Sequence, residues 1–328
     1  MTTDQQEARP GRPPAARHPW HRFVALGDSY TEGVGDPEPL SIGGLRGWAD
    51  RAAEELSVGQ RDFAYANLAV RGLVLQEILD RQLEPALALK PDLVGMSGGG
   101  NDVVFHRGDP DKLAEKMDQA VGLLAETGAT VLLFAGPDWG STPVFSQIRG
   151  RLAIYNEHLH TIGLRHHAVM VDLWCLPALR DARMWDRDRL HLSPLGHQAV
   201  AIATLDALGV PHSLKALQPR PVPSHGWTQA RAEDLIWARQ YLFPWVLRRL
   251  RPRPESRPES LAAKRPEAGP VFGVGLPGPF PPGHPAGSMA LDSREDAAVT
   301  TIGGGTANTA MLEGGAERED VNESGEVA

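Results

Sequence analysis

The chain has 328 residues, of which 41% are hydrophobic and 23% are charged, and its formal net charge is −8. This composition is typical of a globular protein with one good-sized domain and some additional segments. The acidic balance argues against a nucleic-acid-binding protein, which usually carries a strong basic excess.

The first residues indicate neither a secretion signal nor a membrane anchor. Residues 1–20 are rich in Pro, Arg and Gln, contain no apolar core segment, and are predicted to be disordered. No stretch approaches the roughly 20 apolar residues of a membrane span, and the single cysteine, Cys175, suits a reducing compartment. We therefore expect a cytoplasmic protein without stable membrane insertion, with its free thiol buried as a small apolar side chain.

Short apolar runs alternate with longer amphipathic stretches over residues 21–212, which we expect to form one domain. Strands are predicted at 22–27, 63–70, 92–98, 130–136 and 168–174, and helices at 46–57, 73–90, 111–128, 147–167 and from Ser193 onward. Pro85 is expected to interrupt the second of these helices. Strands that alternate with helices predict a parallel sheet covered on both faces. The expected fold is therefore α/β, with a five-stranded, flavodoxin-like sheet.

Two further segments follow this domain. Residues 213–250 contain the amphipathic stretch 226–250, broken near Pro244, and are expected to form a helical extension that packs on the domain. Binding of this stretch to a membrane surface is the less favoured alternative, because acidic residues punctuate its polar face. Residues 251–328 are rich in Pro, Gly and charge and end acidic, so they are predicted to be a disordered tail.

Four polar motifs follow predicted strands in chain order. They are Gly27–Ser29 (GDS), Asn67–Gly72 (NLAVRG), Gly98–Asp102 (GGGND) and Asp188–His191 (DRLH). Open α/β sheets place their sites at the carboxyl ends of the strands. A Gly-Asp-Ser tripeptide alone is more typical of a turn, so the interpretation of its serine depends on the other three motifs.

Each motif supplies a group that a serine nucleophile needs. The Ser29 hydroxyl requires a base within hydrogen-bond reach, and His191 can be that base, because an imidazole exchanges its proton near neutral pH. Asp188 can orient the imidazole and stabilise its charged form. The backbone N–H groups of Ser29 and Gly72 and the side-chain amide of Asn101 can hold the oxyanion.

The order of these motifs resembles that of the SGNH hydrolase family of GDSL-type esterases and lipases, over about residues 22–210, and is similar to intracellular members from high-GC bacteria. The resemblance implies a three-layer α/β/α sandwich. It gives the same catalytic roles to Ser29, Asp188 and His191, and an oxyanion hole to Ser29, Gly72 and Asn101. It implies hydrolysis of a small-molecule or lipid ester without a cofactor or a metal.

Several alternatives remain beside this interpretation. His197 is a rival base, although its place on a predicted helix favours a structural role, and Asp181 and Asp186 are rivals of Asp188 with less suitable spacing. The pair His166–His167 lacks further ligands at metal-binding spacing. An O-acetyl-sugar esterase, a lysophospholipase or an acyl-thioesterase would use the same chemistry, and an inactive binding module would use none of it. Loops 36–46, 103–110 and 137–147 are expected to shape the substrate pocket.

Overall fold

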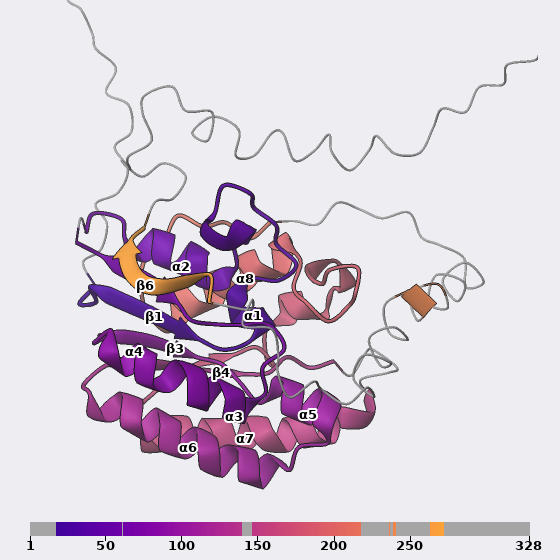
Figure 1. Ribbon diagram of the computed structural model, residues 1–328. Coiled ribbons are helices and arrows are strands. Elements are labelled where there is room, and N and C mark those ends of the chain that lie inside the picture. Colours follow the sequence, from indigo (N-terminus) through magenta and orange to yellow (C-terminus); the bar gives the residue numbers. More distant parts are fainter. Residues whose placement is uncertain are drawn as a thin grey trace, which may run out of the picture. The chain divides into compact units, whose positions relative to one another are not determined.

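The computed structural model of the protein describes residues 18–60, 62–139, 146–217, 236, 239–240 and 263–271. The described strands form one sheet with the order β5-β4-β3-β1-β2-β6 (Figure 1). Their bounds are β1 (Arg22–Leu26), β2 (Ala64–Asn67), β3 (Leu93–Met96), β4 (Thr130–Ala135), β5 (Val169–Asp172) and β6 (Arg265–Pro270). The first five are parallel, in the flavodoxin-like order 2-1-3-4-5, and β6 is antiparallel to β2. The predicted α/β class is confirmed, but the sheet has six strands rather than five.

Helices cover both faces of the sheet. Their bounds are α1 (Ser29–Glu32), α2 (Trp48–Leu56), α3 (Leu75–Ile78), α4 (Glu84–Ala88), α5 (Gly100–His106), α6 (Pro110–Glu126), α7 (Arg149–Arg165) and α8 (Pro194–Ala207). Figure 1 shows α2 and α8 on one face and α3, α4, α6 and α7 on the other, which makes three layers. Pro85 was expected to interrupt the helix, but the helix continues through it. A π-helical turn over Leu79–Leu83 joins α3 to α4, and Pro85 lies in the first turn of α4.

The strands carry apolar side chains on both faces, as expected for a parallel sheet between two helical layers. On β1, Val24 and Leu26 join the core beneath α3, α6 and α7, whereas Phe23 and Ala25 join the core beneath α2 and α8. All four side chains are fully buried. The period-two alternation of β1 therefore divides its apolar residues between two cores, which locks the strand at the centre of the domain.

Strand β6 is a correction to the predicted tail. It lies within residues 251–328, which were expected to be disordered throughout, and it pairs with β2 from Ala64↔Pro270 to Asn67↔Arg265. Side chains add to this pairing, since Lys264 Nζ lies 2.6 Å from Asp50 Oδ2. The apolar pattern of the sequence could not reveal this strand, because backbone hydrogen bonds and charged groups hold it.

Other predicted segments lie largely outside the described residues. These are 1–17 of the N-terminal segment, most of 218–250, and the remainder of 251–328, which includes the whole second unit of the chain, Pro281–Ala328. None of the described helices has the length and apolar character that crossing a bilayer requires. The Cys175 thiol is exposed rather than buried, since it lies in the turn after β5, where its backbone N–H donates to Asp172.

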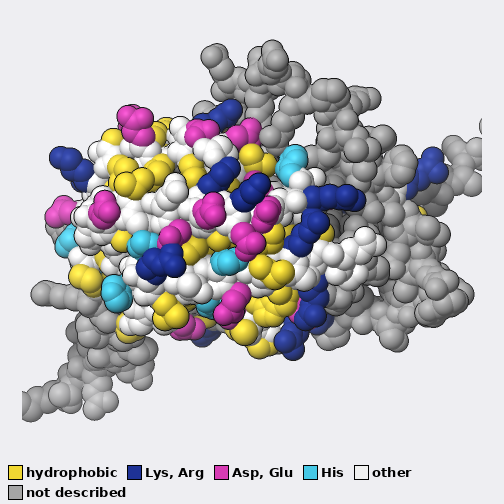
Figure 2. Space-filling model, turned by 90° about the horizontal axis from the view of Figure 1, so that it is seen from below, with side chains coloured by type: hydrophobic (Ala, Val, Ile, Leu, Met, Phe, Trp, Pro, Cys, Tyr) yellow, Lys and Arg dark blue, Asp and Glu magenta, His cyan; other side chains and the backbone are white. Residues whose placement is uncertain are grey.

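The outer face formed by α6 and α7 mixes acidic, basic and apolar side chains, as Figure 2 shows. Ion pairs connect the two helices across this face. Asp118 on α6 accepts hydrogen bonds from Arg165 Nη1 at 2.5 Å and from His166 Nε2 at 2.7 Å, and His158 lies 2.7 Å from Asp111. His166, half of the predicted histidine pair, therefore pairs with a carboxylate on the neighbouring helix.

His197 lies on α8 and is fully buried, in agreement with a structural role. The Trp48 N–H donates to its Nδ1 at 3.2 Å, and its Nε2 lies 3.1 Å from the carbonyl oxygen of Val34. This pattern requires the neutral imidazole with its hydrogen on Nε2. The side chain thereby ties α8 to the start of α2 and to the loop after α1.

The neutral state of His197 predicts a loss of stability in acid. Desolvation lowers the pKa of His197 to about 3, whereas the unfolded chain binds this proton below about pH 6.5. The free energy of unfolding should therefore fall as the pH drops from about 6.5 towards 3. In the variant His197→Gln the amide supplies an acceptor and a donor but does not titrate. Urea unfolding at about pH 7.5 and pH 5 should show the wild type losing about 2 kcal/mol more than the variant. Equal losses would contradict the assignment.

Candidate active site

The loop that carries Ser29 is held by its neighbours in the fold. Gly27 follows β1, and a Cβ at this position would lie 2.6 Å from Thr31 Oγ1 and 2.9 Å from the carbonyl oxygen of Ser97, so only glycine fits. The side-chain amide of Gln82 bonds both backbone groups of Gly27, at 2.8 Å and 2.9 Å. These contacts place Ser29 at the carboxyl end of β1, as the first residue of α1.

Ser29, His191 and Asp188 form a continuous line of hydrogen bonds. Ser29 Oγ lies 3.0 Å from His191 Nε2, and His191 Nδ1 lies 2.5 Å from Asp188 Oδ2. The other carboxylate oxygen, Asp188 Oδ1, accepts from the backbone N–H groups of Leu190 and His191, both at 2.9 Å. Arg189 adopts a positive φ of 57° between them, which closes the turn and brings the carboxylate to the imidazole.

The electrostatics of this line favour an ionised Asp188. Burial alone would raise the pKa of Asp188, but the hydrogen bonds and the charge of His191 outweigh it, so the pKa lies below its usual value. The carboxylate fixes the imidazole hydrogen on Nδ1 and leaves the Nε2 lone pair facing the serine. The rival Asp181 instead pairs with Arg183 at 2.5 Å. The rival base His197 contacts Trp48 and Val34.

Asn101 lies beside the nucleophile loop, but its amide is already engaged. Nδ2 donates to Asp28 Oδ2 and to the carbonyl oxygen of Leu73, both at 2.9 Å, which uses both of its hydrogens. Gly72 immediately precedes Leu73 in the turn after β2 and has a φ of +75°, a conformation that favours glycine. The structure therefore brings together the loops of all four motifs.

Asp28 is a buried carboxylate at the centre of this arrangement. It is 7% exposed and also accepts from the Tyr30 N–H at 3.1 Å. Desolvation raises the pKa of Asp28 to about 6, against the opposing effects of the Tyr30 hydrogen bond and of the His191 charge. This carboxylate is not among the site residues predicted from the sequence. Its contact with Asn101 links the first motif directly to the third.

The residues that flank the predicted oxyanion donors brace the loops. The Arg71 backbone N–H and guanidinium both bind the Glu32 carboxylate of α1, at 2.5–3.1 Å. Asp102 Oδ2 accepts from the Leu75 N–H at the start of α3, at 2.8 Å. These pairs connect the loop after β2 to α1 on one side and to α5 on the other.

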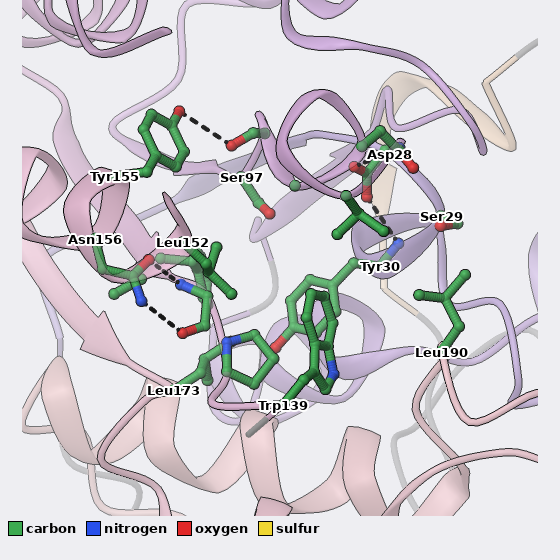
Figure 3. A pocket seen from close by; sticks show the side chains of 18 of the residues that line it. Asp28, Ser29, Tyr30, Ser97, Trp139, Leu152, Tyr155, Asn156, Leu173 and Leu190 are labelled. Carbon is green, nitrogen blue, oxygen red and sulfur yellow. Dashed lines mark hydrogen bonds between the residues drawn. The ribbon is translucent and has the colours of Figure 1, made fainter. Parts of the chain in front are cut away.

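A mainly apolar pocket opens beside Ser29 and His191 (Figure 3). It holds about 800 Å³ of empty space, part of it open to solvent. Its apolar wall includes Phe105 of α5, Phe134 of β4, Trp139, Leu152 and Leu159 of α7, Leu173 and Trp185. The indole rings of Trp139 and Trp185 lie with their centroids 5.9 Å apart and their planes tilted by 57°.

The predicted substrate loops contribute unequally to this pocket. Loop 103–110 supplies Val104 and Phe105, and loop 137–147 supplies Pro137 and Trp139, whereas 140–145 lies outside the described residues. Loop 36–46 supplies none of the described residues that line it. The contribution of α7 to the pocket was not predicted, although the helical spacing of its residues 152, 155 and 159 indicates one buried face.

Comparisons with known proteins point to one family. The model of the family described as GDSL-like Lipase/Acylhydrolase matches residues 25–199, just over half of the chain. This range contains Ser29, Gly72, Asn101, Asp188 and His191. No curated protein matches the chain.

Several solved structures are similar to the chain. An acetylxylan esterase from Geobacillus stearothermophilus is 19% identical, with a TM-score of 0.48 over 61% of this chain and 97% of that one. An alpha/beta hydrolase from the metagenome of Lake Arreo, Spain, is 22% identical, with a TM-score of 0.48 over 58% and 95%. A putative GDSL-like lipase from Parabacteroides merdae is 17% identical, with a TM-score of 0.49 over 57% and 95%.

Proposed function

Because the chain belongs to the GDSL-like lipase and acylhydrolase family, we propose that it cleaves carboxylic esters through an acyl intermediate on Ser29. The observation that carries this proposal is the line of hydrogen bonds from Ser29 Oγ through His191 to Asp188, at 3.0 Å and 2.5 Å. A serine hydroxyl becomes an effective nucleophile when an oriented base lies within this reach.

The proposed reaction has two halves. In acylation, His191 Nε2 takes the proton of Ser29 as Oγ attacks the ester carbonyl carbon, and the carbonyl oxygen becomes an oxyanion. The tetrahedral intermediate then expels the alcohol, which leaves with the proton from His191. In deacylation, His191 takes a proton from water, the hydroxide attacks the acyl-Ser29 carbonyl, and the carboxylic acid leaves as Ser29 regains its proton. Asp188 stabilises the imidazolium in both halves.

The oxyanion is proposed to bind the backbone N–H groups of Ser29 and Gly72 and the Asn101 amide. Since Asn101 Nδ2 already donates to Asp28 and Leu73, the oxyanion must replace one of these acceptors. This exchange makes the Asn101 contribution specific to the transition state, because an uncharged ester oxygen competes poorly with a carboxylate.

For the variant Asn101→Ala we expect kcat to fall on the order of 100- to 1000-fold, with a small change in KM. The reason is that one oxyanion donor is lost while the apolar pocket is kept. Steady-state kinetics on a p-nitrophenyl ester measure the effect, and thermal unfolding checks that the loss of the bonds to Asp28 and Leu73 leaves the domain folded. A folded variant with a near-normal kcat would remove Asn101 from the oxyanion hole.

The pocket supports an acyl group larger than acetyl. Its aromatic and aliphatic wall begins at Ser29 and His191 and extends along α7, so an acetyl group would leave most of the apolar surface unfilled. Burial of each further methylene group favours a longer chain by roughly 0.8 kcal/mol. We therefore favour a carboxylesterase or lipase over an O-acetyl-sugar esterase.

Hydrolysis of p-nitrophenyl esters from acetate to long acyl chains tests this function. We expect activity with an optimum beyond acetate, and inactivation by a fluorophosphonate that leaves a phosphonyl group on the peptide containing Ser29, detected by mass spectrometry. Heat-unfolded protein is the control and should remain unlabelled. Labelling elsewhere, or hydrolysis that persists after Ser29 is fully labelled, would contradict the acyl-Ser29 mechanism.

A further inference from the structure

The pocket beside the nucleophile contains one hydroxyl group that differs from its polar neighbours. Asn156 uses both ends of its amide on the backbone of Gly136, at 2.8 Å each. The Tyr155 hydroxyl donates to the carbonyl oxygen of Gly98 at 3.2 Å. The Tyr30 hydroxyl is buried and has no hydrogen-bond partner among the described residues.

An unpaired hydroxyl of this kind needs a physical reason. A buried polar group without a partner loses its hydrogen bonds to water and regains none on folding. A phenylalanine would fill the same space without this loss. Most such groups in folded proteins are paired, so an exception beside a reactive serine calls for an explanation. The Tyr30 oxygen has no surface open to bulk water in this structure.

The Tyr30 ring is held in a fixed position by aromatic neighbours. Its centroid lies 6.3 Å from that of Trp48, 6.4 Å from that of Phe134 and 6.5 Å from that of His197. Tyr30 directly follows Ser29 on α1, and Figure 3 shows its ring extending from that helix into the pocket. The ring is therefore fixed beside the nucleophile, while its hydroxyl oxygen is enclosed by the surrounding side chains.

The chemistry of this hydroxyl suits a neutral oxygen as its partner. Burial raises the pKa of Tyr30 well above its usual value, and the charge of Asp28 adds to the shift, so the phenol keeps its proton at neutral pH. A neutral phenol can donate one hydrogen bond and accept another. The apolar wall would make the loss of such a bond costly for any ligand that lacked the matching oxygen.

We propose that the Tyr30 hydroxyl binds an oxygen on the acyl part of the substrate, and that the preferred substrates are esters of hydroxylated carboxylic acids. This inference rests on the proposed function, because it places the acyl group in the pocket beside Ser29. The contact forms as the acyl chain enters and the wall around the buried oxygen gives way. Tyr30 thereby selects among acyl chains of equal length.

The test compares p-nitrophenyl hexanoate with its monohydroxylated analogues. For the wild type, kcat/KM for at least one analogue should exceed that for hexanoate by about threefold to tenfold. In the variant Tyr30→Phe this preference should vanish, so that kcat/KM for the analogue no longer exceeds that for hexanoate. The matched control Tyr155→Phe removes a hydroxyl of the same pocket that is already bound to Gly98, and it should keep the preference.

Three results would overturn the proposal. The first is a wild type that hydrolyses hexanoate but prefers none of the analogues, which leaves the serine esterase intact and removes only the role of Tyr30. The second is a preference that survives in Tyr30→Phe or disappears in Tyr155→Phe, which assigns the selection to another group. The third is a wild type that hydrolyses no ester of the set, which overturns the proposed function and this inference together.

Discussion

Replacing Ser29 by alanine is expected to lower kcat for ester hydrolysis on the order of 100,000-fold or more, because no acyl intermediate can form. The substitution should slow the catalytic steps and leave the fold unchanged. The Ser29 hydroxyl bonds His191 Nε2, whereas the backbone of α1 is held by the Asp28 cap and by the Glu32–Arg71 pair. Far-UV circular dichroism and the thermal midpoint should therefore stay near their wild-type values.

The variants of Ser29 and His191 should not be additive. The two groups act as a unit, so His191→Ala alone and the double variant should each lose about as much kcat as Ser29→Ala alone. Steady-state assays on one p-nitrophenyl ester measure all three losses. If the double variant showed the product of the two single losses, the groups would be acting independently. A Ser29→Ala protein that kept a tenth of the wild-type kcat would show that Ser29 is a turn residue and not the nucleophile.

The second large effect is expected from Asp188→Asn, with kcat lower by roughly 10,000-fold. An asparagine amide can donate to His191 Nδ1, which moves the imidazole hydrogen to Nε2 and removes the lone pair that faces Ser29. It also removes the negative charge that stabilises the imidazolium. The bonds that Asp188 Oδ1 accepts from Leu190 and His191 can be kept by the amide oxygen, so the turn should persist.

Asp181→Asn is the matched control for this prediction. Asp181 belongs to the same acidic stretch of the sequence, but its carboxylate pairs with Arg183 at 2.5 Å. Its loss should change kcat by less than about twofold, since partly exposed ion pairs contribute little. Similar losses in the two variants would show that overall charge, rather than the orientation of His191, determines activity.

Much of the fold could be predicted because its signals are local. Apolar runs that alternate with amphipathic stretches predict a parallel sheet, and a polar motif at a strand end predicts a residue at the sheet's reactive edge. Ser29, Asp188 and His191 meet for that reason, although 162 positions separate Ser29 from His191. The short spacing between Asp188 and His191 in the sequence indicates that one turn, at Arg189, carries both residues.

The missed features depend on contacts between distant parts of the chain. The π-helical turn before Pro85 and the pairing of β6 with β2 have no apolar periodicity that predicts them. The two acceptors of Asn101 become visible only when three loops meet. The unpaired hydroxyl of Tyr30 likewise reflects its surroundings rather than its place in the motif.

Strand β6 also covers the edge of the sheet that β2 would otherwise form. Without it, β2 would present a row of unpaired backbone groups, which is a template for edge-to-edge aggregation between molecules. The replacement edge is poorly suited to such growth, because Pro266 and Pro270 have no backbone N–H to donate. A short, proline-interrupted strand from beyond the family-matched range 25–199 thus acts as a guard against self-association. Truncating the chain after α8, which ends at Ala207, would remove the guard while leaving all five predicted site residues in the chain.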